Sequence, residues 1–256
     1  MSSNVVLRLA QRSDIPTLAH IANAGNAQSA LHKRIALYRD QNPICYYHWR
    51  LNIIRERFVT PDLRTIVAED SSSNEILGQA SWAIEGQDTA LYKTWVGEST
   101  WANWLEGKLV WAEKTWCRYV LDKSIDYKFL DRFMAGFLGA EKSSRPACLH
   151  LHMIVIEPSA QSRGVGRMLV DWGKELAMRE GLPLFLEATL EATGFYEKCG
   201  FSRLSKDLLI CPDGQEPIRI PVFIWEGKQR EGVWLERDDS FDGAGERWRW
   251  REDVLP

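Results

Sequence analysis

The segment EPSAQSRGVGRMLVDWGKELAMREG, residues Glu157–Gly181, places two glycines one residue apart at the start of a helical pattern. Apolar residues recur after them at helical spacing. A glycine permits a positive φ and lets another group approach the backbone closely. The amides from Gln161 to Gly166 can therefore point to a common centre, where the helix dipole favours an anion. The segment predicts a phosphate or pyrophosphate site.

Strand patterns flank this helix on both sides. Cys148–Ile156 is continuously apolar except for His150 and His152, as expected for a strand buried on both faces. Leu184–Ala188 follows the helix as a second apolar run. This strand–helix–strand order predicts a right-handed parallel crossover.

Three kinds of glycine loop can be compared with this one. A Walker loop needs lysine and then serine or threonine after its last glycine, but Arg167 and Met168 follow Gly166. A dinucleotide fingerprint needs a third glycine where Leu169 stands. The third pattern, Gln/Arg-x-x-Gly-x-Gly/Ala after a strand, is satisfied at every position. It resembles the pyrophosphate loop of the GNAT acyl-CoA N-acyltransferase superfamily.

A second signature accompanies the loop. The lead-in Ile154–Pro158 is similar to that of the family, and Gly194–Phe201, GFYEKCGF, resembles its helix end "(L/F)-Y-E-K-x-G-F". The resemblance is clearest over residues 148–203 and extends as element order back to residue 4. A long insertion before the loop makes the chain similar to fungal GNAT proteins.

The resemblance implies an α/β (α+β) fold with a mixed, splayed sheet of about six to seven strands flanked by helices. We expect a domain at residues 1–225 with a helical, tryptophan-rich insertion at about 85–145, and a charged tail at 226–256. For the insertion tryptophans we favour helix–helix packing over pocket lining. Other expected strands are 5–9, 63–68, 75–84, 203–211 and 218–225, the last two joined by a turn at 212–214; expected helices lie near 15–22, 31–38, 43–58 and 191–198.

The resemblance also implies acetyl-CoA as cosubstrate, lying between the strands 148–156 and 184–188. The implied cofactor-binding residues are Ile154, Val155, Ile156, Gln161, Ser162, Arg163, Gly164, Val165, Gly166, Arg167, Thr189, Phe195, Tyr196 and Lys198. For two of them a plainer interpretation stays open: Thr189 as a turn residue and Lys198 as solvated surface charge.

The family reaction is direct attack of an amine on the thioester within a ternary complex. Tyr196 matches the tyrosine that serves as acid at the CoA sulfur. His150 stands where some members have a carboxylate base, and His152 lies two residues on, on the same face. Histidine has a suitable pKa, about 6.5, to accept a proton. Buried core histidines, or loss of the proton to water alone, are the alternatives.

Aromatic residues in the early helices and the insertion suggest the acceptor. The residues that we expect to line its site are Tyr38, Trp82, Trp95 and Trp101, because an aromatic wall suits an apolar amine or a cation. We expect the primary amine of a small molecule. The alternatives are a peptide or protein amine, or an inactive CoA-binding regulatory protein.

Composition narrows the possible partners, cofactors and cellular setting of the protein. The chain has 256 residues and a net charge of −3, which gives no reason to expect a nucleic-acid partner. Its five cysteines have no metal-ligand spacing, so no metal is expected and a reduced, cytoplasmic setting fits. No apolar run predicts a signal peptide or a membrane span. A monomer or a homodimer is expected.

Overall fold

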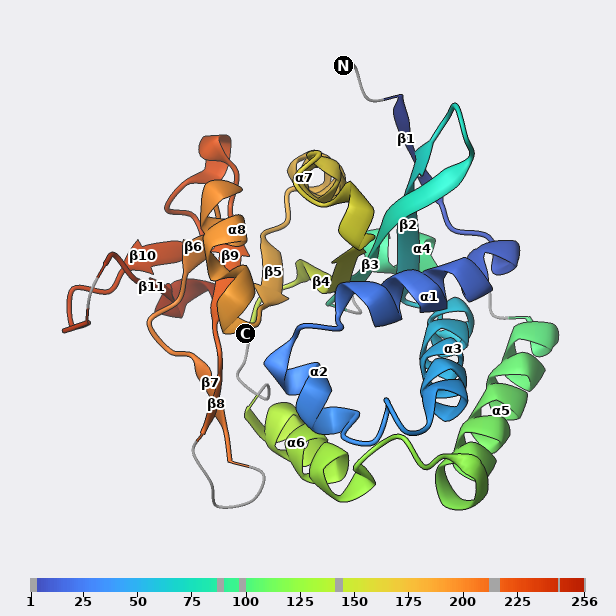
Figure 1. Cartoon of the computed structure of the whole chain (residues 1–256). Helices are drawn as coiled ribbons and strands as arrows, with labels where there is room; N and C mark the ends of the chain where they lie inside the picture. Colours follow the sequence, from blue (N-terminus) through green and yellow to red (C-terminus); the bar gives the residue numbers. More distant parts are fainter. Residues whose placement is uncertain are drawn as a thin grey trace.

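The computed structural model describes residues 4–86, 90–96, 100–140, 145–211, 217–243 and 245–255. Its centre is a seven-stranded sheet in the order β1-β2-β3-β4-β5-β9-β6 (Figure 1). The strands are β1 (Val5–Leu9), β2 (Leu63–Asp70), β3 (Glu75–Glu85), β4 (Cys148–Ile156), β5 (Leu184–Glu187), β6 (Ser202–Arg203) and β9 (Val222–Trp225). Only β4 and β5 pair in parallel, and the other neighbours are antiparallel. The expected mixed α/β sheet is confirmed.

Helices cover both faces of this sheet (Figure 1). One face carries α1 (Ile15–Gly25) and α3 (Pro43–Val59), which pack through Leu18 and Ile54 onto Val67 of β2. The other face carries α7 (Val165–Glu180) and α8 (Thr193–Lys198), whose apolar residues join those of β3, β4 and β5 in the largest buried cluster. The short helix α2 (Ala30–Ile35) lies between α1 and α3 in the chain.

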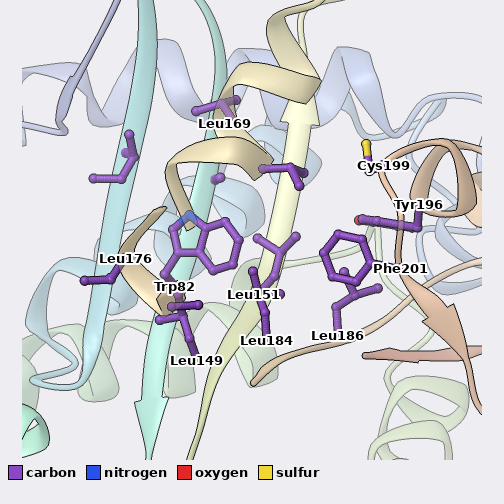
Figure 2. Packing of buried hydrophobic residues seen from close by; sticks show 14 of the residues in the cluster. Trp82, Leu149, Leu151, Leu169, Leu176, Leu184, Leu186, Tyr196, Cys199 and Phe201 are labelled. Atoms are coloured by element: carbon purple, nitrogen blue, oxygen red, sulfur yellow. The ribbon is translucent and has the colours of Figure 1, made fainter. Parts of the chain in front are cut away.

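Trp82 lies at the centre of the cluster beneath α7, and not at a substrate surface. Its side chain is completely buried, and Figure 2 shows it among Leu149, Leu169 and Leu176. A Cβ at Gly173 would lie 2.3 Å from the indole ring, so the glycine is what lets α7 pack this closely. The prediction of Trp82 as a pocket residue is therefore wrong, because its ring fills the core.

The insertion contains α4 (Ala90–Val96), α5 (Trp101–Trp116), a π-helical turn (Cys117–Leu121) and α6 (Tyr127–Ala140). Helix α5 packs on α3 through Val110 and through ion pairs from Glu113 and Lys114. Its tryptophans point elsewhere: Trp101, Trp104, Trp111 and Trp116 are 78%, 61%, 67% and 59% exposed. The helix–helix packing predicted for them is wrong, because α5 uses its charged face against α3.

The two long strands predicted near the C-terminus are each divided. β7 (Leu208–Ile210) and β8 (Ile218–Ile220) form a separate ribbon that packs on α6, while β6 and β9 stay in the main sheet. Pro221 separates β8 from β9; it has no N–H for a strand ladder. The turn predicted at 212–214 lies outside the described residues.

The tail folds back onto the sheet. β10 (Leu235–Arg237) pairs with β11 (Trp248–Trp250), and Leu235 packs against Phe185 and Ile224. Within the described residues, no helix combines the length and the apolar character that crossing a membrane requires.

Candidate active site

β4 and β5 separate soon after they meet. Their parallel pairing covers only Leu149 with Leu184 and His150 with Phe185. The amide of Glu157 donates to Leu77 of β3 at 2.9 Å. Because amides alternate in direction along a strand, those of Ile154 and Ile156 face the open edge beside β5. The gap between the strands thus exposes two aligned donors.

The backbone amide of Val155 faces away from those of Ile154 and Ile156, with which it was predicted to bind the cofactor. The same alternation turns its amide toward Gln79 of β3, with which it is paired. Its side chain is buried against α1, where a Cβ at Gly25 would lie 2.3 Å from it. Val155 therefore belongs to the core under α1, and we leave it out of the site.

The loop before α7 has the open backbone that an anion needs. Gly164 caps the helix with φ of 85° and Ser162 has φ of 63°, both in the left-handed region. No side chain caps α7. Among the described residues, the amides of Gly164, Val165, Gly166 and Arg167 donate to no protein acceptor. Free amides at a helix N-terminus suit a pyrophosphate.

The two glycines of this loop are required for different structural reasons. Gly164 has nothing within 4 Å of a hypothetical Cβ, so its requirement is the positive φ. Gly166 is helical, and a Cβ there would lie 3.3 Å from the ring of Phe195. The second glycine thus lets α8 approach the loop, which places Phe195 and Tyr196 beside the open strands.

Tyr196 extends from α8 toward β4 and β5 (Figure 2). The residue is 5% exposed and its ring packs against Phe195, Phe201 and Phe223. Its hydroxyl has no hydrogen-bond partner among the described residues. Burial raises the pKa of the phenol far above its ordinary value of about 10, so the group keeps its proton.

The remaining predicted contacts belong to the segments that follow β4 and β5 in the chain. Thr189 follows β5, half-buried, and the exposed Lys198 accepts a 3.5 Å hydrogen bond on its carbonyl from Arg167. Arg163 lies 3.9 Å from Asp70, and Gln161 is exposed.

His150 is held between two carboxylates. It is 3% exposed; its Nδ1 lies 2.5 Å from Glu85 Oε1 and its Nε2 lies 2.7 Å from Glu187 Oε2. Burial alone would lower the pKa of His150, but Glu187 and Glu85 outweigh it and raise the pKa to about 9. Glu85 also accepts a 2.6 Å bond from Arg145. At neutral pH the ring is an imidazolium.

His152 has a different environment on the same face. Its side chain is exposed and its ring centroid lies 4.1 Å from that of His150. The protein packed around it, and then the His150 cation, lower its pKa. His152 is thus a neutral imidazole that solvent can reach.

The raised pKa of His150 makes stability depend on pH. A group whose pKa is higher in the folded than in the unfolded protein stabilises the fold below its unfolded pKa, and this contribution is lost as pH rises through the folded pKa. The free energy of unfolding should therefore fall by about 1–3 kcal/mol between pH 6.5 and pH 9. Urea titrations across this range test it. His150→Gln should flatten the slope; an unchanged slope would contradict the assignment.

Glu85 and Glu187 were missed by reasoning from sequence. Glu187 interrupts an otherwise apolar strand, a signal that was available; its side chain is 8% exposed and its Oε1 is buried without a partner. Ligand atoms of Glu85, His150 and His152 also lie within 4.8 Å of one another, close enough for a cation. Because carboxylates occupy both nitrogens of His150, we interpret the group as a hydrogen-bond network.

The predicted acceptor-site aromatics do not gather at this opening. Trp95 packs on the α7 side, and its Nε1 donates to the Asp62 carbonyl at 2.7 Å. Trp101 is 78% exposed at the start of α5, and Tyr38 is 45% exposed in the turn after α2. With Trp82 in the core, no common aromatic wall forms from these four residues.

Comparison with known proteins agrees with the fold and the loop. Residues 106–201 match the acetyltransferase (GNAT) family. The uncharacterized N-acetyltransferase C56E4.07 of Schizosaccharomyces pombe is 25% identical over 180 residues, 70% of this chain and 75% of that protein. The probable acyltransferase SID5 of Ajellomyces capsulatus is 36% identical over 50 residues, 20% of this chain and 37% of that protein.

A solved structure shows the same fold. The histone acetyltransferase HPA2 and related acetyltransferase from Corynebacterium glutamicum superposes with a TM-score of 0.51 at 17% identity, covering 86% of this chain and 95% of that one. The diverging strands and the uncapped loop, together with these matches, define an acetyltransferase. Residues 106–201 thus carry the match to the GNAT acetyltransferase family, and the chain as a whole has the fold of that solved acetyltransferase.

Proposed function

We propose that the protein is an acetyl-CoA-dependent N-acetyltransferase that modifies the primary amine of a small molecule by direct attack in a ternary complex. One juxtaposition carries the proposal: β4 leads from His150 and His152, past the point where its pairing with β5 ends, to the uncapped start of α7, and α8 brings Tyr196 into the cluster shared by β4 and β5. An inactive CoA-binding protein would not need Tyr196, His150 and His152 in this arrangement.

Binding uses main-chain groups. The amides of Gly164 to Arg167 would hold the pyrophosphate and those of Ile154 and Ile156 the pantetheine arm. When bound, acetyl-CoA supplies an acyl group activated as a thioester. A β4 amide near Ile154 would donate to the thioester oxygen as negative charge develops on it.

His152 is the group placed to receive the proton of the acceptor ammonium, directly or through one water. It is neutral and exposed, whereas His150 is buried and already charged. His150 is therefore a positioning residue. As His152 takes up a proton, His150 can release its own across the 2.7 Å bond to Glu187, so that only one of the two neighbouring rings is charged.

Tyr196 would donate to the departing sulfur. Because its hydroxyl bonds to none of the described residues, Tyr196→Phe removes an oxygen without leaving one of them unpaired. We expect kcat to fall by about 10–100-fold with little change in melting temperature or in KM for acetyl-CoA. Steady-state kinetics with thermal unfolding check this. Unchanged turnover between pH 6 and 9 would exclude the role.

Release of free thiol from acetyl-CoA, measured against a panel of amines, tests the proposal as a whole. Turnover with small amines supports it. Activity confined to peptide or protein amines would instead favour the macromolecular alternative. Binding of acetyl-CoA in calorimetry without turnover of any amine would favour the regulatory alternative.

A further inference from the structure

Among the described residues, two arginines of α3 lack the carboxylate partners of their neighbours, and a third arginine nearby pairs only with an exposed carboxylate. Arg50 and Arg57 lie seven residues apart on α3, and Arg39 lies in the turn before it. Within the described residues neither Arg50 nor Arg57 has a carboxylate partner. On the same helix, by contrast, Arg55 pairs with Glu113 at 2.5 Å.

Arg50 is the most deeply placed of them. It is 3% exposed, and its hydrogen-bond partners among the described residues are neutral. Its Nε donates to Asn23 Oδ1 at 3.1 Å, its Nη2 donates to the Tyr46 hydroxyl at 3.4 Å, and its guanidinium lies 4.9 Å from the Trp49 ring. A buried charge without a counterion is costly. Such a group in a native structure needs an explanation, and a ligand that supplies the missing charge is one.

The guanidinium of Arg57, on the same helix as Arg50, contacts residues of the sheet. Its Nη1 donates to Ser81 Oγ at 3.1 Å and contacts Met153 Sδ at 2.9 Å. Met153 is the residue after His152, so the guanidinium lies beside the position proposed for the acceptor amine. Burial, and then Arg50, lower the pKa of Arg57 to about 10, and Glu56 opposes this only in part.

Arg39 extends the positive region away from the sheet. Its side chain is 16% exposed, and its Nη1 is buried without a hydrogen-bond partner. Its nearest carboxylate, Asp40 at 3.6 Å, is itself 94% exposed and contributes little. Burial, then Arg50 and Arg39, lower the pKa of His32, which places all three groups within electrostatic range.

We propose that Arg50, Arg57 and Arg39 bind a carboxylate of the acceptor, which makes the substrate an amino acid or a related zwitterion with its amine at His152. The inference rests on the proposed acetyltransferase function and deepens it. A guanidinium presents its N–H donors in a planar fork that matches a carboxylate. Arg57 would bind the acceptor's carboxylate on the side next to its amine. Arg50 would supply most of the positive charge that this carboxylate neutralises.

Matched acceptor pairs test this directly. Phenylalanine is compared with 2-phenylethylamine, and ornithine with 1,4-diaminobutane, each pair differing by one carboxylate. We expect kcat/KM with acetyl-CoA to be at least about tenfold higher for the acid of at least one pair. If the decarboxylated amine is as good or better in both pairs, the carboxylate site is overturned, whereas absence of thiol release with every amine would refute the proposed function.

Variants of the arginines give a second test. Arg57→Gln and Arg50→Met should each lower the acid-to-amine ratio of kcat/KM by about 10–100-fold. Arg55→Gln, on the same helix, is the control and should leave that ratio unchanged. Because Arg50→Met removes an uncompensated buried charge, its melting temperature should equal or exceed that of the wild type. A lower melting temperature with an unchanged ratio would assign Arg50 a structural role and overturn the proposal.

The carboxylate has one other possible source, the acyl group. Succinyl-CoA is therefore compared with acetyl-CoA using 2-phenylethylamine as acceptor. We expect acetyl-CoA to be the better donor for wild-type protein. A preference for succinyl-CoA that disappears in Arg57→Gln would show that the arginines hold the donor's carboxylate, and would overturn the acceptor assignment.

Discussion

His152→Gln is expected to lower kcat/KM for the amine by about 10²–10³-fold at pH 7, the range that a positioned base contributes. His152 is the neutral, exposed imidazole of the neighbouring pair His150 and His152. The deficit should shrink as pH rises, because an amine that has already lost its proton in solution does not need the base. Rate profiles from pH 6 to pH 10 measure this.

Two comparisons make the result specific. His48→Gln changes an exposed histidine of α3 that lies edge-on to Tyr47, and it should leave the profile unaltered. His150→Gln should reduce kcat by less than His152→Gln, because its partners are Glu85 and Glu187 and it acts through its neighbour. If His150→Gln lowered the rate and His152→Gln did not, His150 would be the base and His152 the positioning residue.

Gly164→Val is expected to raise the KM for acetyl-CoA by about 100-fold while the protein still folds. The backbone there has φ of 85°, which a β-branched residue resists, so the amides at the start of α7 would lose their common direction. Nothing lies within 4 Å of the added Cβ, so the effect is conformational and not a packing clash. Isothermal titration with acetyl-CoA reports the loss without requiring turnover.

Gly139→Val is the matched control for this substitution. Gly139 also has nothing within 4 Å of an added Cβ, but it lies on α6 in ordinary helical conformation. It should cost a fraction of a kcal/mol of stability or improve it, and leave acetyl-CoA binding unchanged. Equal binding by both variants would remove the anion site on which the enzyme assignment depends.

The parts of the site that sequence predicted are local. The amides of the loop, the helix after it and the strand before it lie within Cys148–Glu180, and their patterns of glycine and apolar residues encode geometry over a few residues. The parallel pairing of β4 with β5 follows from the same short crossover.

A bulge in β4 is a feature of the site that the local sequence pattern did not predict. Ser81 pairs with Met153 and Trp82 with Leu151, so His152 has no partner in β3. Strict alternation would put Ile154 on the face of His150, but its side chain packs in the cluster under α7. The sequence of the strand carries no mark of this shift.

Periodicity also misled about the tryptophans. It indicates that a helix has an apolar side, but not what that side meets. Trp82 became core because Gly173 of α7 comes close to it, whereas Trp101 and its neighbours on α5 stayed exposed because α3 packs on the charged side.

The sequence alone determined the family, the order of strands and helices around the loop, and the chemical types that surround it, because these depend on neighbours in the chain. Only the tertiary structure decided which histidine holds a proton, since Glu85 and Glu187 lie 65 and 37 residues from His150. It also decided that Arg50 is buried with no carboxylate partner in the described parts of the chain, since burial and charge pairing depend on distances in space.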